Sequence, residues 1–260
     1  MTSGLTVAAA GDPAPLLSLD QVSACPPGAK IPVLTDVTLK IGRGERVALV
    51  GPSGAGKTTL LRTINGQIPP AAGRVAFDGV DLGSLGVAEL RRTRSHIGLV
   101  TQQHDLVDML RVDKNVMAGA LGRWSVSRAL RFLIWPRQDE LAQASRALAD
   151  VGLADKLLRR TASLSGGERQ RAAIARALVQ APTLLLADEP VASLDPETAR
   201  DVLELLVKVS KTHGMALICA LHQHDLADRY FERILEMRDG RIFERQADVA
   251  DPVVPALHKA

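Results

Sequence analysis

The chain has 260 residues, of which 46% are hydrophobic, 23% charged and only 3% aromatic, and its formal net charge is +3. These values are typical of a globular protein with one large or two small domains, and they exclude a chain dominated by low-complexity sequence. No apolar run is long enough to cross a bilayer and no positive charge precedes Lys30, so we expect neither a membrane span nor a secretory signal. Cys25 and Cys219 lack metal-binding spacing and are expected to be reduced thiols.

Short apolar strands alternate with helices along most of the chain. Residues 45–51 form a β-rich run that ends at a glycine, and a helix is predicted from Lys57 to about Gly66. Runs of the same kind predict three further buried strands, at 95–102, 182–190 and 215–223. A helix over 196–213 follows Asp195, a typical N-cap. This alternation indicates an α/β fold with a mostly parallel sheet.

Two segments predict antiparallel hairpins. Residues 233–243 place an Asp-Gly pair between two apolar runs, and residues 33–50 place Gly42 and Gly44 in a similar position. The segment from about 103 to 162 is instead rich in helical patterns and in arginine, with its clearest amphipathic helix at 139–153. We therefore expect a helical subdomain (103–162) inserted into one domain (17–245). Residues 1–16 are expected to be a disordered tail, and residues 246–260 a C-terminal tail.

Residues 51–58, with the sequence GPSGAGKT, match the phosphate-binding pattern G-x-x-x-x-G-K-[ST]. A strand precedes the motif and a helix follows it, so glycine N–H groups and the positive end of the helix dipole meet at one place. Lys57 is expected to reach the β- and γ-phosphates of a nucleotide, and Thr58 to hold Mg²⁺. The predicted nucleotide-binding residues are Gly51, Pro52, Ser53, Gly54, Ala55, Gly56, Lys57, Thr58 and Thr59.

The strand predicted at 183–190 ends in two carboxylates. Asp188 is expected near the metal, and Glu189 is expected to polarise an attacking water. The alternative is a strand followed by an acidic helix cap. Further along, Ser165, Gly166 and Gly167 stand before or at the start of a helix, where a hydroxyl and free N–H groups can bind an anion. Because the P-loop already serves one triphosphate, this second site suits the nucleotide of another copy.

The run LSGGERQ, with the P-loop before it and LLLADEP after it, resembles the signature of ATP-binding cassette (ABC) ATPases, and the resemblance extends from about Leu17 to Phe243. It implies a P-loop NTPase fold with an antiparallel β subdomain and an inserted α-helical subdomain. It also implies that two copies pair head to tail, with each ATP between one P-loop and the partner's signature. The residues implied to face the partner's ATP are Ser165, Gly166, Gly167 and Glu168.

The same resemblance assigns roles to residues outside these motifs. Gln102, with Gln103 as the alternative, matches a glutamine that contacts Mg²⁺ and links to the membrane subunit. Ser193 and Asp195 match the D-loop, and His222 matches a histidine that reaches the γ-phosphate. The implied catalytic residues are therefore Glu189, His222 and Gln102, and the implied metal ligands are Thr58, Gln102 and Asp188.

One position departs from the family pattern. An aromatic residue after the first strand normally stacks on adenine, whereas this chain has Cys25, Pro26 and Pro27 there. Base–aromatic stacking contributes roughly 1–3 kcal/mol. We therefore predict weaker ATP binding and weaker discrimination against GTP, with packing by a proline ring as the alternative to the missing ring.

A single short cassette without a long coiled-coil insert or fused membrane spans resembles the separate ATPase subunit of a bacterial-type transporter. Within the insert, the chain is similar to phosphonate import ATP-binding subunits at Asn115, Val116, Gly119, Leu121 and Gly122. The resemblance implies ATP hydrolysis that energises phosphonate uptake, with integral membrane permease subunits and, indirectly, a periplasmic or extracellular substrate-binding protein as partners. It implies a peripheral location on the cytoplasmic face of the inner or plasma membrane. The alternatives are an importer of another oxyanion and a soluble ABC ATPase acting on nucleic acid or ribosomes, although we expect no nucleic-acid partner.

The insert also gathers aromatic residues in a chain that has few. Trp124, Phe132 and Trp135 lie close together in sequence, with arginines between them. The pattern is compatible with ordinary packing of the insert or with a docking face for the membrane subunit, because Trp and Arg are common interface anchors. A basic, base-stacking surface for nucleic acid is a third interpretation.

Overall fold

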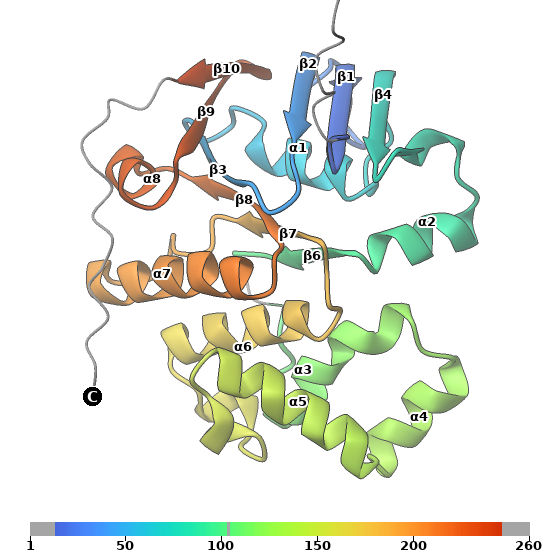
Figure 1. Ribbon diagram of the computed structural model, residues 1–260, viewed down its shortest axis with the longest axis vertical. Coiled ribbons are helices and arrows are strands. Elements are labelled where there is room, and N and C mark those ends of the chain that lie inside the picture. Colours follow the sequence, from blue (N-terminus) through green and yellow to red (C-terminus); the bar gives the residue numbers. More distant parts are fainter. Residues whose placement is uncertain (1–13, 103–104, 246–260) are drawn as a thin grey trace, which may run out of the picture.

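The computed structural model describes residues 14–102 and 105–245. The predicted tails at 1–16 and 246–260 lie outside these residues except for 14–16, among which Leu16 is buried. The strands form two sheets, and a layer of helices covers the far side of the larger sheet (Figure 1). The predicted α/β fold, with an antiparallel β subdomain and an added helical layer, is confirmed.

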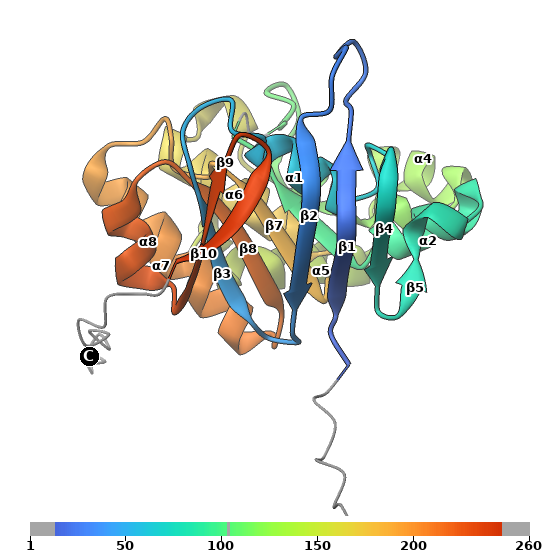
Figure 2. The same ribbon diagram turned by 90° about the horizontal axis from the view of Figure 1, so that it is seen from above.

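The small sheet is antiparallel and has the strand order β2-β1-β4-β5. Its strands alternate buried and exposed side chains, because one face packs on the core and the other faces solvent. The strands are β1 (Leu17–Ala24), β2 (Leu34–Ile41), β4 (Ala72–Phe77) and β5 (Val80–Asp81). The loop between β1 and β2 projects beyond the sheet (Figure 2).

The large sheet has the order β10-β9-β3-β8-β7-β6, and its core strands pair in parallel. Each of the four predicted buried strands is present in it. The hairpin predicted at 233–243 is also confirmed, since β9 and β10 pair antiparallel around the Asp239–Gly240 turn. The strands are β3 (Arg46–Val50), β6 (Ile97–Val100), β7 (Leu184–Asp188), β8 (Ala216–Leu221), β9 (Arg233–Arg238) and β10 (Arg241–Arg245).

The hairpin predicted over 33–50 is wrong. β2 and β3 belong to different sheets: β2 pairs with β1, and β3 lies between β8 and β9. The burial of the two strands explains the difference. β2 alternates, whereas β3 is buried on both faces and therefore takes a central place in the parallel sheet. The turn after Gly42 carries the chain from one sheet to the other.

The two faces of the parallel sheet border two cores. Val47 and Leu49 of β3 pack with α1 and the small sheet, whereas Ala48 and Val50 pack with α6 and α7 on the opposite face. α1 thus lies between the two sheets, and α6 and α7 lie below the larger one (Figure 1). The helices outside the insert are α1 (Lys57–Ile64), α2 (Val87–Arg94), α6 (Gly166–Leu178), α7 (Pro196–Thr212) and α8 (His224–Tyr230).

The predicted insert is a helical layer beneath α6 (Figure 1). It contains α3 (Val112–Met117), α4 (Val126–Ile134) and α5 (Gln138–Asp150). Of the insert's three aromatic residues, Trp124 and Phe132 are buried and meet edge to face, with ring centroids 5.2 Å apart. Ordinary packing therefore explains these two, and only Trp135, 79% exposed, is open to a partner.

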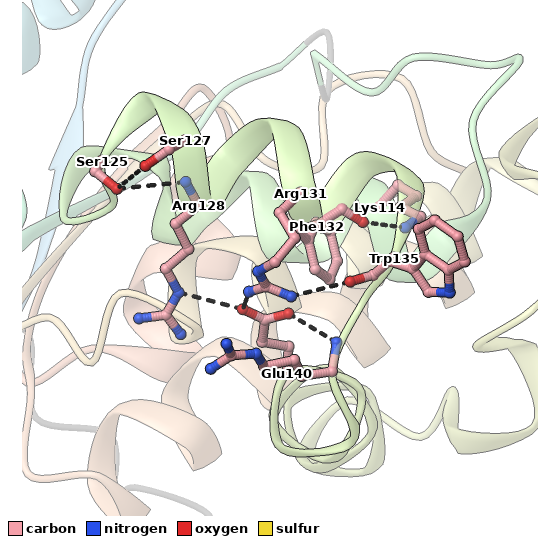
Figure 3. A network of polar contacts seen from close by, with 9 residues as sticks. Lys114, Ser125, Ser127, Arg128, Arg131, Phe132, Trp135 and Glu140 are labelled. Carbon is pink, nitrogen blue, oxygen red and sulfur yellow. Dashed lines mark hydrogen bonds and ion pairs between the residues drawn. The ribbon is translucent and has the colours of Figure 1, made fainter.

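A buried carboxylate joins α4 to α5 (Figure 3). Glu140 accepts hydrogen bonds from Arg131 Nη2 (2.5 Å), Arg128 Nε (3.2 Å) and the Arg137 backbone N–H (2.9 Å). Burial opposes ionisation of Glu140, but these hydrogen bonds outweigh it and lower the pKa of the carboxyl below its usual range. Arg128 also lies over the Trp124 ring, 4.5 Å from its centroid. These two arginines therefore serve the internal structure of the insert.

We expect Glu140→Gln to lower the free energy of unfolding at pH 7 by about 1–3 kcal/mol, because charged hydrogen bonds to a buried acceptor are lost. A carboxyl whose pKa is lowered on folding stabilises the fold above its unfolded-state pKa, and that stabilisation disappears as pH falls through the folded-state pKa. The difference between variant and wild type should thus stay constant from pH 7 to about pH 5 and shrink only below about pH 4, measured by urea unfolding. Glu204→Gln, on the exposed face of α7, is the matched control. A pH-independent difference would contradict the assignment.

Candidate functional site

The P-loop, residues 51–56, connects β3 to α1 as predicted. Gly56 stands at the N-cap of α1 with φ +108°, a backbone conformation that residues with a Cβ rarely adopt, so the position favours glycine. No side chain caps α1, and its first turn has no acidic residue. The N–H groups at this helix end are therefore left for an anion.

A hollow of about 230 Å³ opens beside this helix end. The described residues that line it are Val33, Gly54, Gly56, Lys57, Thr58, Thr59 and Glu189. Five of them belong to the predicted nucleotide-binding set and one to the predicted catalytic set. Sequence reasoning missed Val33, because it reaches the hollow only through the pairing of β1 with β2.

Lys57 is buried and its ammonium group is held by several acceptors. Nζ donates to the carbonyl oxygens of Gly51 (2.7 Å) and Pro52 (3.1 Å), which are in the P-loop itself. Nζ also lies 3.3 Å from His222 Nδ1 and 3.5 Å from Glu189 Oε1. The amine is thus positioned at the mouth of the loop by groups from three separate segments of the chain.

His222 connects Lys57 to Glu189. Its Nε2 lies 2.6 Å from Glu189 Oε1, and its Nδ1 faces Lys57. Because an ammonium group can only donate, Nδ1 must accept, so a neutral His222 carries its hydrogen on Nε2 and donates it to Glu189. His222 follows β8 and Glu189 follows β7, two strands that are neighbours in the sheet. Adjacent strands thus bring the two side chains, each expected at the nucleotide, within hydrogen-bond distance of each other.

Glu189 adopts a left-handed backbone conformation, with φ +51°, that non-glycine residues rarely take. The conformation is fixed by its N–H, which donates to Ala220 O (3.2 Å), and by its carbonyl, which accepts from Ala192 N (3.3 Å). Such strain costs on the order of 1–3 kcal/mol and tends to occur where function needs it. Here it accompanies a carboxylate that lines the hollow.

Asp188 and Thr58 form the other polar side of the site. Thr58 Oγ1 donates to Asp188 Oδ1 at 3.1 Å. Burial, assisted by the charge of Glu189, raises the pKa of Asp188 above its usual range, although the Thr58 hydrogen bond opposes this. A hydroxyl and a carboxylate beside a phosphate-binding loop are oxygen ligands that suit Mg²⁺, which binds through one or two carboxylates and substrate phosphates. Among the described residues, no cluster of three or more His, Cys, Asp and Glu could hold a metal by itself, so the phosphates of a bound nucleotide would have to complete the site.

Comparison with known proteins identifies the family. A family model described as "ABC transporter" matches residues 34–192, more than half of the chain. The chain belongs to the ABC transporter family. A curated relative, "Phosphonates import ATP-binding protein PhnC" of Hyphomonas neptunium, is 43% identical over 228 residues, which are 87% of this chain and 85% of the relative.

Solved ABC structures share the fold. "Dimeric Structure of MJ0796, a Bacterial ABC Transporter Cassette" has a TM-score of 0.77 and 31% identity, covering 90% of this chain and 99% of that one. A post-hydrolysis dimer of the same cassette, bound to ADP and Pi, has a TM-score of 0.74 with the same identity and coverage. In the part of this ABC protein that the structure describes, no helix has the length and apolarity to cross a membrane.

The ABC signature residues lie at the start of α6 and do not line the hollow. Ser165 caps the helix: its Oγ accepts from Glu168 N (3.2 Å), and Glu168 Oε2 accepts from Ser165 N (2.8 Å). These hydrogen bonds, with Lys156 nearby, lower the pKa of Glu168. Ser165 and Gly166 remain exposed. The cap uses only the acceptor capacity of the serine hydroxyl, so its hydrogen stays available to a phosphate.

The two signature glycines differ in their packing. A Cβ on Gly167 would lie 2.6 Å from Thr198 Cγ2 of α7, so this glycine is required by the contact between the two helices. A Cβ on Gly166 would meet only Leu194 at an ordinary 3.6 Å. The predicted D-loop residues are also exposed, and Asp195 caps α7 by accepting from the N–H groups of Glu197 and Thr198.

Gln102 lies in an exposed turn after β6 and does not line the hollow. Its alternative, Gln103, falls outside the described residues. The structure thus brings Lys57, Thr58, Asp188, Glu189 and His222 together, and leaves Gln102, the signature and the D-loop on the surface.

Proposed function

We propose that the chain is the ATP-hydrolysing subunit of an ABC importer that takes up phosphonates. The convergence of Lys57, His222 and Glu189 at the end of the P-loop carries the proposal of hydrolysis, because it joins a phosphate ligand to a base. The phosphonate assignment is supported by the relative named for phosphonate import, which this chain matches over most of both lengths.

ATP binds with its phosphates at the N-terminus of α1 and along the P-loop from Gly51 to Gly56. Lys57 neutralises the terminal phosphates, and Thr58 and Thr59 border the same hollow. Thr58 and Asp188 would hold Mg²⁺, with Gln102 as a further ligand from its turn, and the ion would supply positive charge that offsets the charge of the β- and γ-phosphates. Burial raises the pKa of Asp188, and a cation bound beside it would favour its ionised form.

Hydrolysis requires Glu189 to accept a proton from the attacking water. In the present structure this carboxylate is bound by His222 and Lys57. When the γ-phosphate enters, Lys57 and His222 can donate to its oxygens instead, which leaves Glu189 Oε1 free to accept. The water oxygen then attacks phosphorus in line, its proton passes to Glu189, and ADP leaves with the former bridging oxygen.

A second copy completes the site. Ser165 and Gly166 are exposed at the start of α6, with Gly167 and Glu168 directly behind them, and this helix end can take the partner's ATP. Ser193 and Asp195 flank Leu194, which borders Gly166. The similarity to the dimeric MJ0796 cassette supports this head-to-tail pairing. The remaining partners are membrane permease subunits, to which this chain binds on the cytoplasmic face of the membrane. Through the permease it works with a substrate-binding protein on the opposite side.

The outer face of α4 is the docking surface for a permease subunit. It exposes Val126, Leu130, Leu133 and Ile134, spaced as one helical stripe, with Trp135 at its end. This surface replaces the predicted one, since Trp124 and Phe132 are buried. The neighbouring arginines Arg128 and Arg131 bind Glu140, and the exposed residues of the stripe are aliphatic. This surface therefore suits a protein helix better than a nucleic acid. The alternative of a nucleic-acid or ribosome ATPase is less favoured for this reason.

Glu189→Gln should retain ATP binding, lose turnover by at least about 100-fold as expected for loss of a general base, and accumulate an ATP-bound dimer. Size-exclusion chromatography with Mg²⁺ and ATP, together with phosphate release, measures both effects. Glu232→Gln, whose side chain is 82% exposed outside the site, is the control. Normal turnover of Glu189→Gln would remove Glu189 as the base.

Uptake by cells tests the function directly. Replacement of the wild-type chain by Lys57→Ala should abolish uptake of labelled aminoethylphosphonate and spare phosphate and phosphite, because the buried ammonium is needed at the phosphates. If uptake of phosphate or phosphite were lost instead, the chain would still be the ATPase of a transporter, but that anion would be its ligand. Unchanged uptake of all three would favour the non-transport alternative.

Leu130→Asp combined with Ile134→Asp should prevent co-purification with the permease subunits, because charges would have to be buried in the interface. ATP binding by the isolated chain should not change. Leu158→Asp, which alters another exposed leucine of the insert, is the matched control. Full assembly of the double variant would show that the membrane subunit docks elsewhere.

A further inference from the structure

The turn of the β9–β10 hairpin reaches the P-loop. β9 pairs in parallel with β3, the strand that leads into the P-loop, so the end of β9 arrives beside Gly51. The turn consists of Asp239 and Gly240, both with positive φ (+46° and +74°), as a primed two-residue hairpin turn requires. The hairpin also lies next to β2 (Figure 2). Three segments of the chain therefore meet at this turn.

The backbone of Gly240 forms hydrogen bonds with two of these segments. Its N–H donates to the carbonyl oxygen of Ala55 in the P-loop (3.1 Å), and its own carbonyl oxygen accepts from the N–H of Thr35 in β2 (2.9 Å). Gly240 and Ala55 are both buried. An unpaired backbone group here would be costly, because water cannot readily replace the lost partner. The turn is therefore a fixed bridge from β2 to the P-loop.

The close approach of the hairpin leaves no room for a side chain at two glycines. A Cβ on Gly240 would overlap the carbonyl oxygen of Val33, which precedes β2. A Cβ on Gly51, the first residue of the P-loop, would overlap the carbonyl oxygen of Met237 in β9. Both obstacles are backbone atoms, which cannot turn aside as the end of a flexible side chain can. Glycine at these positions thus allows the hairpin to contact β2 and the P-loop backbone to backbone.

The hydrogen bond to Ala55 also sets the direction of the next N–H group. The peptide between Ala55 and Gly56 is planar and trans, so its carbonyl and its N–H point in opposite directions. Because Gly240 holds the carbonyl on the hairpin side, the N–H of Gly56 points away from the hairpin. Gly56 lines the hollow and stands at the N-cap of α1, where N–H groups can bind an anion. One hydrogen bond from the hairpin thus fixes an N–H group at the anion site.

We propose that Gly240 is a positioning residue of the nucleotide site, which holds the P-loop in its phosphate-binding shape through the carbonyl of Ala55. Gly240 itself does not line the hollow. The inference rests on the proposed function only in that the P-loop holds the phosphates of a nucleotide. ATP and ADP present phosphates to the same loop, so loss of this hydrogen bond should weaken the binding of both. Other contacts hold Lys57, Glu189 and His222, so turnover at saturating ATP should be retained.

Gly240→Ala tests the bridge, and the chain contains a matched control. The turn between β4 and β5, Asp78–Gly79, has the same two residue types and similar positive φ (+50° and +77°), but a Cβ on Gly79 would meet no atom within 4 Å. Gly240→Ala should raise the Kd of ADP and the KM for ATP together by about 2- to 10-fold, with kcat nearly unchanged. Gly79→Ala carries the same unfavourable φ and should bind ADP as the wild type does.

Calorimetric titration of the purified full-length chain with ADP and Mg²⁺, together with steady-state ATP hydrolysis, measures these constants. A second measurement needs no substitution. In wild-type chain labelled with ¹⁵N-glycine, the amide signal of Gly240 should move during the ADP titration, because coupling between a hydrogen bond and a ligand acts in both directions. The amide signals of Gly79 and Gly214, which are glycines in turns elsewhere, should stay in place.

A folded Gly240→Ala that binds ADP as tightly as the wild type would overturn the inference, as would an equal loss of affinity in Gly79→Ala. A fall in kcat with an unchanged Kd of ADP would also overturn it, because the hairpin would then act on hydrolysis and not on the P-loop. If Gly240→Ala does not fold, the wild-type signal of Gly240 decides: a signal that ADP leaves in place rejects the inference. A wild type that binds no ADP would instead overturn the proposed function itself.

Discussion

The buried ammonium group of Lys57 is the interaction on which the site depends. An unpaired charge in this position would be strongly destabilising, so the surrounding chain must supply acceptors. It does so from the P-loop carbonyls, from the residue after β7 and from the residue after β8. The adjacent parallel strands β3, β8 and β7 bring these three chain segments to one edge of the sheet. The architecture of the parallel sheet is thus tied to the position of a single amine.

The grouping of these residues could be anticipated from the sequence for a physical reason, while their roles stay predictions. Asp188 ends a short apolar strand, Glu189 and His222 directly follow such strands, and Lys57 follows one after the P-loop; the carboxyl ends of neighbouring parallel strands meet at one edge. The residue types then define the chemistry. The roles of Gln102, Ser193 and the signature stay predictions, because they depend on a second copy or a bound nucleotide.

Other features depend on tertiary context that local patterns do not contain. Glycines between two apolar runs predicted a hairpin for 33–50. Whether the two strands pair with each other or enter different sheets depends on how many faces of each strand are buried. The aromatic cluster of the insert was compatible with ordinary packing or with a docking face, and the sequence could not decide between them; Trp124 and Phe132 pack on each other, while an aliphatic stripe faces outward. Val33 carries no motif at all, and Glu140 could not be recognised as a buried acceptor from a run of charged residues.

The contact between Gly167 and Thr198 has a mechanical consequence. It joins the first turns of α6 and α7, the two helices whose ends carry the signature and the D-loop. Because the two first turns pack this closely, a displacement of the helix end at Ser165 requires an adjustment at the helix end that carries Asp195.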